Sequence, residues 1–346
     1  MDGINLNHAY HNNPVIQIRD LCVDYITDNG DFNAVKAVSF DIGKGEVFGL
    51  AGESGCGKSI TGLSIMQLVH SAGRTEGGRI MFREFADGQS VNILDYGRNS
   101  AEMRGIRGNN ISMIFQEPMT SLNPVLTIGT QIAENVVRHM GVSKKAARDR
   151  ACEMLELVRI ADARRRLDEY PHQLSGGMRQ RVMIAMALSC DPQVLIADEP
   201  TTALDVTIQA QILDLMLDLK EKTGTAIVLI THDLGVVAEN VDRVAVMYLG
   251  RVVECGSAAE LFAAPRHPYT RALLSAIPQA QPTGKSAGAP LQGDVPSPLN
   301  PPSGCHFHTR CPHRMPRCEQ EAPVLESGST ASTAHPVACH LWHDLP

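Results

Sequence analysis

The feature that most constrains this sequence is a glycine-rich loop between a short apolar run, residues 47–51, and a segment with helical spacing, residues 59–69. The loop fits the pattern G-x-x-x-x-G-K-S/T with the residues Gly52, Glu53, Ser54, Gly55, Cys56, Gly57, Lys58 and Ser59. The glycines let the backbone curl so that its N–H groups point at phosphate oxygens, next to the positive end of a helix. We therefore expect nucleotide binding, with Lys58 at the β- and γ-phosphates and the Ser59 hydroxyl on Mg²⁺. A glycine-rich turn without a ligand is the alternative, and the strand–loop–helix context argues against it.

Two later strand ends carry side chains suited to phosphate chemistry. The apolar run 194–197 ends in Asp198 and Glu199, and the run 226–231 leads to His232. Core strands deliver such residues to the sheet edge where ligands bind. We expect Asp198 to hold Mg²⁺, Glu199 to orient the attacking water, and His232 to contact the γ-phosphate and Glu199. Taken singly, the acidic pair also fits a strand end that meets solvent, and the histidine fits an ordinary loop position.

The order of the apolar segments predicts an α/β fold. Strands are expected at residues 15–21, 35–42, 47–51, 111–115, 194–197, 226–231, 244–248 and 251–255, and helices at 59–69 and 208–222. Strands that alternate with helices form a parallel sheet with helices on both faces. Residues 127–190 have a mostly helical pattern and interrupt this order, which indicates an inserted helical subdomain.

The composition excludes several classes of protein. Apolar residues make up 43% of the 346 residues and charged residues 20%, which favours a folded core over global disorder. Because 38 acidic side chains exceed 31 basic ones, a dedicated nucleic-acid-binding protein is not expected. The N-terminal residues are polar and lack a signal-peptide pattern, and no apolar run has the length of a membrane span. We therefore expect a cytosolic chain that reaches a membrane through partners.

A third motif indicates a second anion site. Ser175, Gly176 and Gly177 open a predicted helix, where the serine caps the first turn and the glycines leave its N–H groups uncovered. One nucleotide does not need two such sites from one chain. Together with the phosphate loop, the sequence LSGGMRQR at 174–181 resembles the signature of ABC ATPases, with Met178 where the family usually has glutamine. The resemblance implies an ABC-type P-loop NTPase core in which this loop caps ATP bound by the partner chain.

Further positions match that family in order. The resemblance implies that Gln116 binds Mg²⁺ near the ATP site, that Tyr25 stacks on adenine, and that the segment Ala203-Leu204-Asp205 communicates across the dimer beside the nucleotide. Without the resemblance, Gln116 is an ordinary polar loop residue and Tyr25 an ordinary strand aromatic.

Three longer stretches narrow the resemblance to the oligopeptide/dipeptide/nickel importer ATPases: FQEPMTSLNP at 115–124, YPHQL at 170–174 and RHPYT at 266–270. The resemblance implies a peripheral ATPase on the cytoplasmic face of the bacterial inner membrane, which drives uptake of peptides, or of nickel, glutathione, opines or sugars. It also implies three kinds of partner: a second ATPase chain, often a different one, two transmembrane permease subunits, and an extracytoplasmic solute-binding protein. No nucleic-acid partner is implied.

Four of the nine cysteines lie near the C-terminus: Cys305, Cys311, Cys318 and Cys339. Disulfides are not expected in a reducing compartment, and four thiolates suit a [4Fe–4S] cluster or tetrahedral zinc. No C-x-x-C pair is present, so the spacing alone leaves a metal-free tail open. Related dipeptide-importer ATPases carry the same four cysteines and some hold a [4Fe–4S] cluster, which favours the cluster over zinc.

Cys56 lies inside the phosphate loop, at the N-terminus of the predicted helix. Such a position often lowers the pKa of a thiol. We expect alkylation of Cys56 to block ATP binding, and bound ATP to protect it.

We expect a nucleotide-binding domain over residues 1–278, with its helical subdomain at about 117–190, a Pro/Gly/Ser/Ala-rich linker at 279–302, and the four-cysteine extension at 303–346. Two alternatives are a soluble ABC ATPase of translation, DNA repair or cluster assembly, and a non-catalytic scaffold. The single cassette and the lack of long insertions argue against the first. The intact Glu199 and His232 argue against the second.

Overall fold

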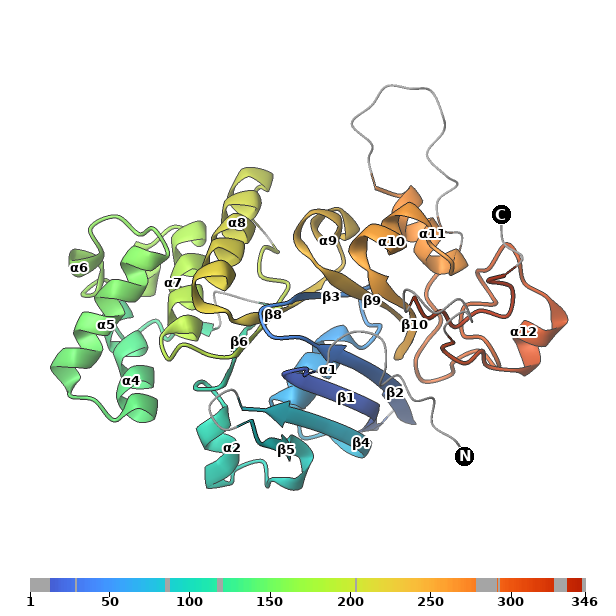
Figure 1. Cartoon of the computed structure of the whole chain (residues 1–346), viewed down its shortest axis with the longest axis horizontal. Helices are drawn as coiled ribbons and strands as arrows, with labels where there is room; N and C mark the ends of the chain where they lie inside the picture. Colours follow the sequence, from blue (N-terminus) through green and yellow to red (C-terminus); the bar gives the residue numbers. More distant parts are fainter. Residues whose placement is uncertain are drawn as a thin grey trace. The chain divides into compact units, whose positions relative to one another are not determined.

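The computed structural model describes residues 13–28, 30–84, 88–116, 121–202, 204–277, 291, 293–326 and 335–343. The chain forms two compact units, one of residues 1–82 and 231–346 and the other of residues 83–230 (Figure 1). Parts of the motifs at 115–124 and 203–205, and most of the expected linker, lie outside the described residues. Among the helices that are described, none has the length and apolar character needed to cross a membrane.

The first unit contains an antiparallel sheet with β1 (Ile16–Thr27) between β2 (Gly30–Ile42) and β4 (Gly73–Arg83). Ile16 pairs with Ile42 on one side and with Phe82 on the other. Alternate residues of β1 are buried, as expected for strands with one covered face. The strand β4 was not predicted from the sequence, since most of its residues are polar or glycine and its three apolar residues, Ile80, Met81 and Phe82, come near its end.

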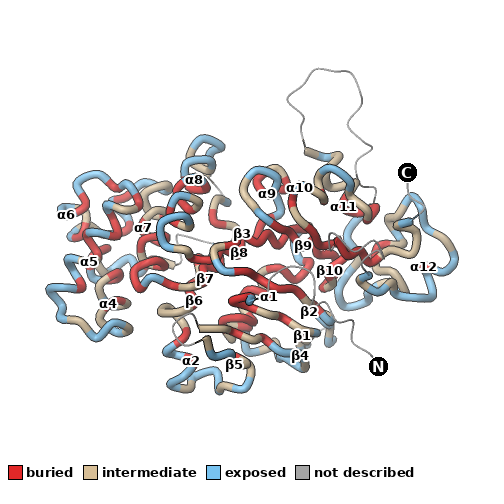
Figure 2. Tube along the Cα trace, in the orientation of Figure 1, coloured by how far each residue is buried: buried red, intermediate tan, exposed pale blue. Residues whose placement is uncertain are grey.

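A second set of strands in the same unit leads to the phosphate loop. It has the order β10 (Arg251–Ser257), β9 (Arg243–Tyr248) and β3 (Val47–Ala51). β3 and β9 are parallel, and β9 and β10 form a hairpin. Every residue of β3 and β9 is buried, which explains their continuous apolar sequences (Figure 2).

Short helices complete the first unit: α1 (Lys58–Ile65), α9 (Leu234–Asn240), α10 (Ala258–Ala263), α11 (Pro268–Ser275) and α12 (Pro316–Gln320). The expected helix at 59–69 is therefore shorter than predicted. It ends before Gln67, whose φ of 48° lies in the left-handed region and cannot continue an α-helix.

The second unit contains the parallel strands β6 (Ile111–Ile114), β7 (Val194–Asp198) and β8 (Ala226–Thr231) in that order. Its larger helices are α4 (Ile128–Met140), α5 (Lys144–Leu157), α7 (Gly176–Leu188) and α8 (Val206–Thr223). Its shorter elements are β5 (Ser90–Asn92), η1 (Ile93–Asp95), α2 (Ala101–Ile106), α6 (Ala163–Arg166) and η2 (Pro171–Gln173).

The helices α4 to α7 lie together between β6 and β7 in the chain and confirm the predicted helical insertion (Figure 1). Their starts follow the expected capping chemistry. Thr127, Ser143 and Ser175 each accept a hydrogen bond from a first-turn N–H of α4, α5 and α7. Gly141, with a φ of 65°, ends α4 in the left-handed conformation that glycine adopts without strain.

Candidate functional site

The phosphate loop runs from Gly52 to Gly57, between β3 and α1, and two of its glycines are required by the space around them. Gly52 has a φ of 146° and Gly57 a φ of 103°. A Cβ atom at Gly52 would lie 2.3 Å from the carbonyl oxygen of Met247, and one at Gly57 would lie 2.6 Å from that of Ala34. Any side chain at these positions would collide with backbone atoms, so the loop can take this course only with glycine.

Lys58 is turned back into this loop. Its Nζ atom donates to the carbonyl oxygens of Gly52 at 2.7 Å and of Glu53 at 2.9 Å, and the residue is only 5% exposed. The ammonium group is therefore held at the centre of the loop, where a bound phosphate would be attracted to it. Ser59 is half-buried in the first turn of α1.

Cys56 corrects one expectation from the sequence. The residue is 2% exposed, and burial raises the pKa of its thiol, while the nearby Lys58 ammonium acts in the opposite direction with a smaller effect. The expected lowering of the pKa is therefore wrong. Desolvation of the thiolate outweighs the helix end and the neighbouring positive charge.

The second unit brings Gln116 and Glu199 together. Glu199 follows β7, and its Oε2 atom accepts hydrogen bonds from the Nε2 atom of Gln116 at 3.1 Å and from the Oγ1 atom of Thr202 at 2.8 Å. Its backbone has a φ of 46°, a strained conformation for a residue with a side chain, of the kind that is concentrated at functional sites. Asp198, the last residue of β7, is buried.

Sequence reasoning missed Thr202 and Gln180 as neighbours of this carboxylate segment. Gln180, on α7, is fully buried and its amide donates to the carbonyl oxygen of Pro200. The hydrogen bond connects the helix that begins at Ser175 to the segment directly after Glu199. The position of Gln180, five residues after the helix cap, is visible in the sequence, but its burial, which makes the amide require a partner, is visible only in the structure.

The serine–glycine motif has the expected helix start. Ser175 is the N-cap of α7, and its Oγ atom accepts from the N–H of Met178 at 3.4 Å. Gly176 is exposed, and a Cβ atom at Gly177 would lie 3.1 Å from the Cγ2 atom of Ile208. The start of the first turn at Gly176 is thus open to solvent, and a side chain at position 177 would require Ile208 of α8 to shift.

Three other predicted site residues lie in a hairpin, at a helix start and after a strand: Tyr25, Asp205 and His232. Tyr25 lies opposite Phe32 in the β1–β2 hairpin, with their ring centroids 5.6 Å apart and stacked, so a second aromatic ring accompanies the predicted one. Asp205 caps α8 by accepting from the N–H of Ile208 at 2.9 Å. His232 is exposed directly after β8 and belongs to the first unit, whereas Gln116, Glu199 and Ser175 belong to the second.

The four C-terminal cysteines line one small cavity together with His308, His313 and His340. Burial raises the pKa of the Cys305 thiol to about 11, and the neighbouring thiols add to the rise. The donor chemistry therefore fits a soft metal ion or an iron–sulfur cluster, whose charge would release these protons. In the described part of the chain, however, no three Cys, His, Asp or Glu side chains are arranged to hold an ion. The described residues fit a single metal ion in kind but not in spacing.

The sequence is similar to known protein families and to individual known proteins. Residues 35–202 match the family model "ABC transporter", and residues 253–318 match "Oligopeptide/dipeptide transporter, C-terminal region". The chain is 51% identical over 330 residues to the dipeptide transport ATP-binding protein DppD of Bacillus subtilis, covering 94% of each chain. It is 48% identical over 312 residues to DppD of Escherichia coli, covering 90% of this chain and 92% of that one.

The fold is also similar to that of a solved structure. The ATP-binding cassette MJ0796, in a dimeric post-hydrolysis state bound to ADP and phosphate, is 28% identical with a TM-score of 0.60, and the match covers 70% of this chain and 98% of that one. The α/β P-loop fold with its helical subdomain and C-terminal extension is thereby confirmed. The chain belongs to the oligopeptide/dipeptide importer family of ABC transporter ATP-binding proteins and is an ABC-type ATPase.

Proposed function

We propose that this chain hydrolyses ATP to drive the import of di- or oligopeptides, or of a related small solute, through membrane partners. The observation that carries the proposal is the match to a dipeptide transport protein at 51% identity over 94% of the chain. The match includes the C-terminal region that has its own oligopeptide/dipeptide transporter model. A general ABC ATPase would share only the cassette.

Each candidate residue has a role in this proposal. Lys58 binds the phosphates. Ser59, Asp198 and Gln116 supply the oxygen ligands that Mg²⁺ prefers, and the ion would neutralise the charge of the phosphates. Glu199 polarises the attacking water. Its hydrogen bonds from Gln116 and Thr202 hold the carboxylate in one orientation, which supports this role.

Two chains are needed for a complete site in this proposal. Gly176 and Gly177, behind the Ser175 cap, close over a nucleotide held by the phosphate loop of a second ATPase chain, either identical or different. His232 contacts the γ-phosphate, Tyr25 stacks on adenine, and Asp205 lies at the dimer contact. The MJ0796 cassette is described as dimeric, which supports such an assembly. The partners are two permease subunits and a solute-binding protein, and the chain is peripheral on the cytoplasmic face of the membrane.

We also propose that Cys305, Cys311, Cys318 and Cys339 bind a [4Fe–4S] cluster, with zinc as the alternative. Their position around one cavity supports this, although the side chains must move closer to coordinate an ion. Iron and zinc analysis of anaerobically purified protein, with the visible absorption spectrum, tests the proposal. A colourless and metal-free sample would exclude both metals.

The transport function is tested with the full chain and its membrane subunits in proteoliposomes. We expect di- or oligopeptides, presented with the binding protein, to stimulate ATP hydrolysis and to be taken up. Lys58→Ala should abolish both activities, whereas Lys144→Ala, at an exposed lysine of α5, should leave both intact. Uptake of nickel or sugar but no peptide would refute peptides as the cargo and leave the related small solute, and a lack of any ATP hydrolysis would refute the proposal as a whole.

A further inference from the structure

Glu53 joins the phosphate loop to the C-terminal region, residues 253–318. The guanidinium group of Arg310 donates two parallel hydrogen bonds to this carboxylate, from Nη1 to Oε2 at 2.7 Å and from Nη2 to Oε1 at 3.0 Å. The arginine side chain is 5% exposed and that of the glutamate 26% exposed. A largely buried, two-pronged pair of this kind fixes both partners in position far better than a surface ion pair does.

The backbone of the same glutamate is also held. Its N–H donates to the hydroxyl oxygen of Tyr269 at 2.9 Å, and its carbonyl oxygen accepts from Nζ of Lys58 at 2.9 Å. Tyr269 is fully buried at the start of α11. One residue of the loop thus connects the phosphate-binding lysine to two side chains from the C-terminal region.

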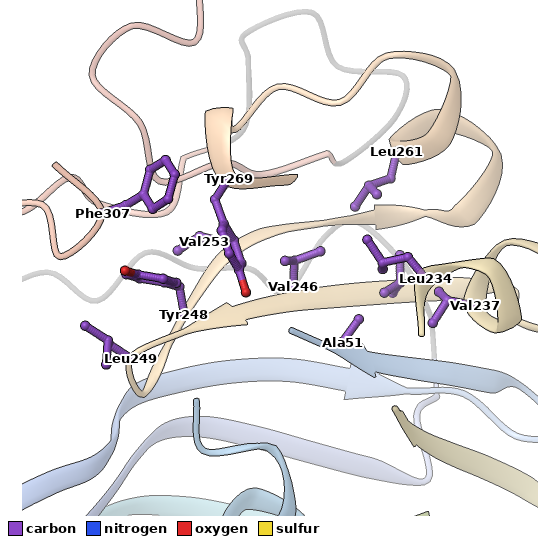
Figure 3. Close-up of a cluster of buried hydrophobic side chains, with 11 residues drawn as sticks. Ala51, Leu234, Val237, Val246, Tyr248, Leu249, Val253, Leu261, Tyr269 and Phe307 are labelled. Carbon is purple, nitrogen blue, oxygen red and sulfur yellow. The ribbon is translucent and has the colours of Figure 1, made fainter. Parts of the chain in front are cut away.

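The two side chains rest on a rigid base. Phe307 lies 5.4 Å from Tyr269 and 5.3 Å from Tyr248 between ring centroids, and all three rings belong to one buried cluster (Figure 3). The N–H of Arg310 donates to the carbonyl oxygen of Phe307 at 3.0 Å. The aromatic cluster therefore fixes where the guanidinium group can lie.

We propose that Arg310 and Tyr269 are positioning residues of the nucleotide site: they hold Glu53, and through it the phosphate loop, in the conformation that binds ATP. This inference rests on the proposed binding of ATP by the loop. Arg310 also neutralises a carboxylate that would otherwise carry an unpaired negative charge in a loop that binds phosphates, and like charges repel. The C-terminal region is then part of the nucleotide site.

The test is the affinity of the full chain for ADP and ATP, measured by fluorescence titration. Arg310→Gln should weaken binding about tenfold, the size expected for loss of a charge-assisted pair. Tyr269→Phe, which removes only the acceptor oxygen, should weaken it about threefold. The matched control is Arg317→Gln, since Arg317 also makes a two-pronged contact, from Nε at 2.7 Å and from Nη2 at 3.0 Å to Glu321, on an exposed surface of the same region. It should bind nucleotide as the wild type does.

A rescue experiment separates positioning from folding of the C-terminal region. The double variant Glu53→Gln, Arg310→Gln should bind ATP more tightly than Arg310→Gln alone, because the unpaired carboxylate is gone. If Arg310 served only to stabilise the C-terminal region, a change in the loop would not restore the affinity for nucleotide that is lost in Arg310→Gln. Wild-type affinity in both Arg310→Gln and Tyr269→Phe, or no rescue in the double variant, would overturn the proposal. If the wild type itself binds no nucleotide, the failure is that of the proposed function.

Discussion

Glu254 offers the sharpest test of how the last described segment, residues 335–343, is attached. This β10 carboxylate is fully buried. Its Oε1 atom accepts from the N–H of Arg266 at 2.6 Å and pairs with Nε2 of His335 at 2.7 Å, and its Oε2 atom accepts from the N–H of His267 at 3.0 Å. One side chain therefore joins three segments of the chain, and Glu254→Gln is the smallest change that disturbs it.

The expected cost follows from counting donors. A glutamine offers one acceptor oxygen and one NH₂ group, so that at least one of the three donors must face another donor. An unsatisfied buried donor costs about 1–3 kcal/mol, and the loss of charge from the remaining bonds adds about 1 kcal/mol. We expect Glu254→Gln to destabilise the attachment of the segment by about 2–4 kcal/mol.

Hydrogen exchange at single amides measures this local stability, since a chain of two units does not unfold in one step. The N–H of Ala338 donates to Val253 at 2.8 Å and reports directly on the attachment. Its exchange should accelerate about 30- to 1000-fold in Glu254→Gln, by the relation of about 1.4 kcal/mol per factor of ten. The matched control is Glu326→Gln. The backbone of Glu326 forms a β-bridge with Val337, as the backbone of Glu254 does, but the side chain of Glu326 is exposed. Equal exchange of Ala338 in the two variants would refute the reasoning.

The pH dependence of this attachment has a defined sign. Burial alone would raise the pKa of Glu254, but the hydrogen bonds from the side chains of His335 and Thr270 and from the amides of Arg266 and His267 hold it below its ordinary value. The folded form therefore binds fewer protons than the unfolded form in acid. The stabilisation is complete above the ordinary glutamate pKa of about 4.3 and is lost as the pH falls through the lower, folded value. Exchange at Ala338 should accelerate with acid in the wild type, beyond the intrinsic trend, and not in Glu254→Gln.

Two further predictions concern the ATP site. Glu199→Gln should bind ATP and remain in a closed dimer, with turnover reduced at least about 100-fold because the water is no longer polarised; wild-type turnover in a phosphate-release assay would contradict this. Cys56 should react with iodoacetamide more slowly than the half-buried Cys22, because burial both shields its thiol and raises the thiol pKa; mass spectrometry of labelled peptides measures both rates, and faster labelling of Cys56 would contradict it.

Local chemistry made the phosphate loop and its flanking elements predictable. The strand 47–51 agrees with β3, because an apolar run followed by glycines has few other conformations. Residues 194–197 fall within β7 for the same reason, and the serine cap at 175 opens α7 as expected. In each case the apolar run or the capping residue that predicts the strand or helix lies within that strand or helix or directly at its end.

Contacts between distant residues could not be predicted in this way. β4 contains few apolar residues and is held by pairing with β1, so its sequence gave no period to detect. Arg310 and Glu53 are 257 positions apart, and each alone is an ordinary charged residue. The pKa of Cys56 was mispredicted because the sequence shows the helix end but not the depth of burial. What remained hidden was tertiary packing, which decides pairing and desolvation.

The packing also bears on how the C-terminal region should be regarded. Ala51, directly before the phosphate loop, belongs to the same buried cluster as Tyr269 and Phe307 (Figure 3). A chain cut after residue 278 would lose Phe307 and Arg310, which would expose part of that cluster and leave the Glu53 carboxylate without its arginine. The loop's conformation depends on residues more than 200 positions away, at 216 positions for Tyr269 and 257 for Arg310. The minimal cassette defined by the phosphate loop and the signature motif is therefore smaller than the unit that holds this loop in place.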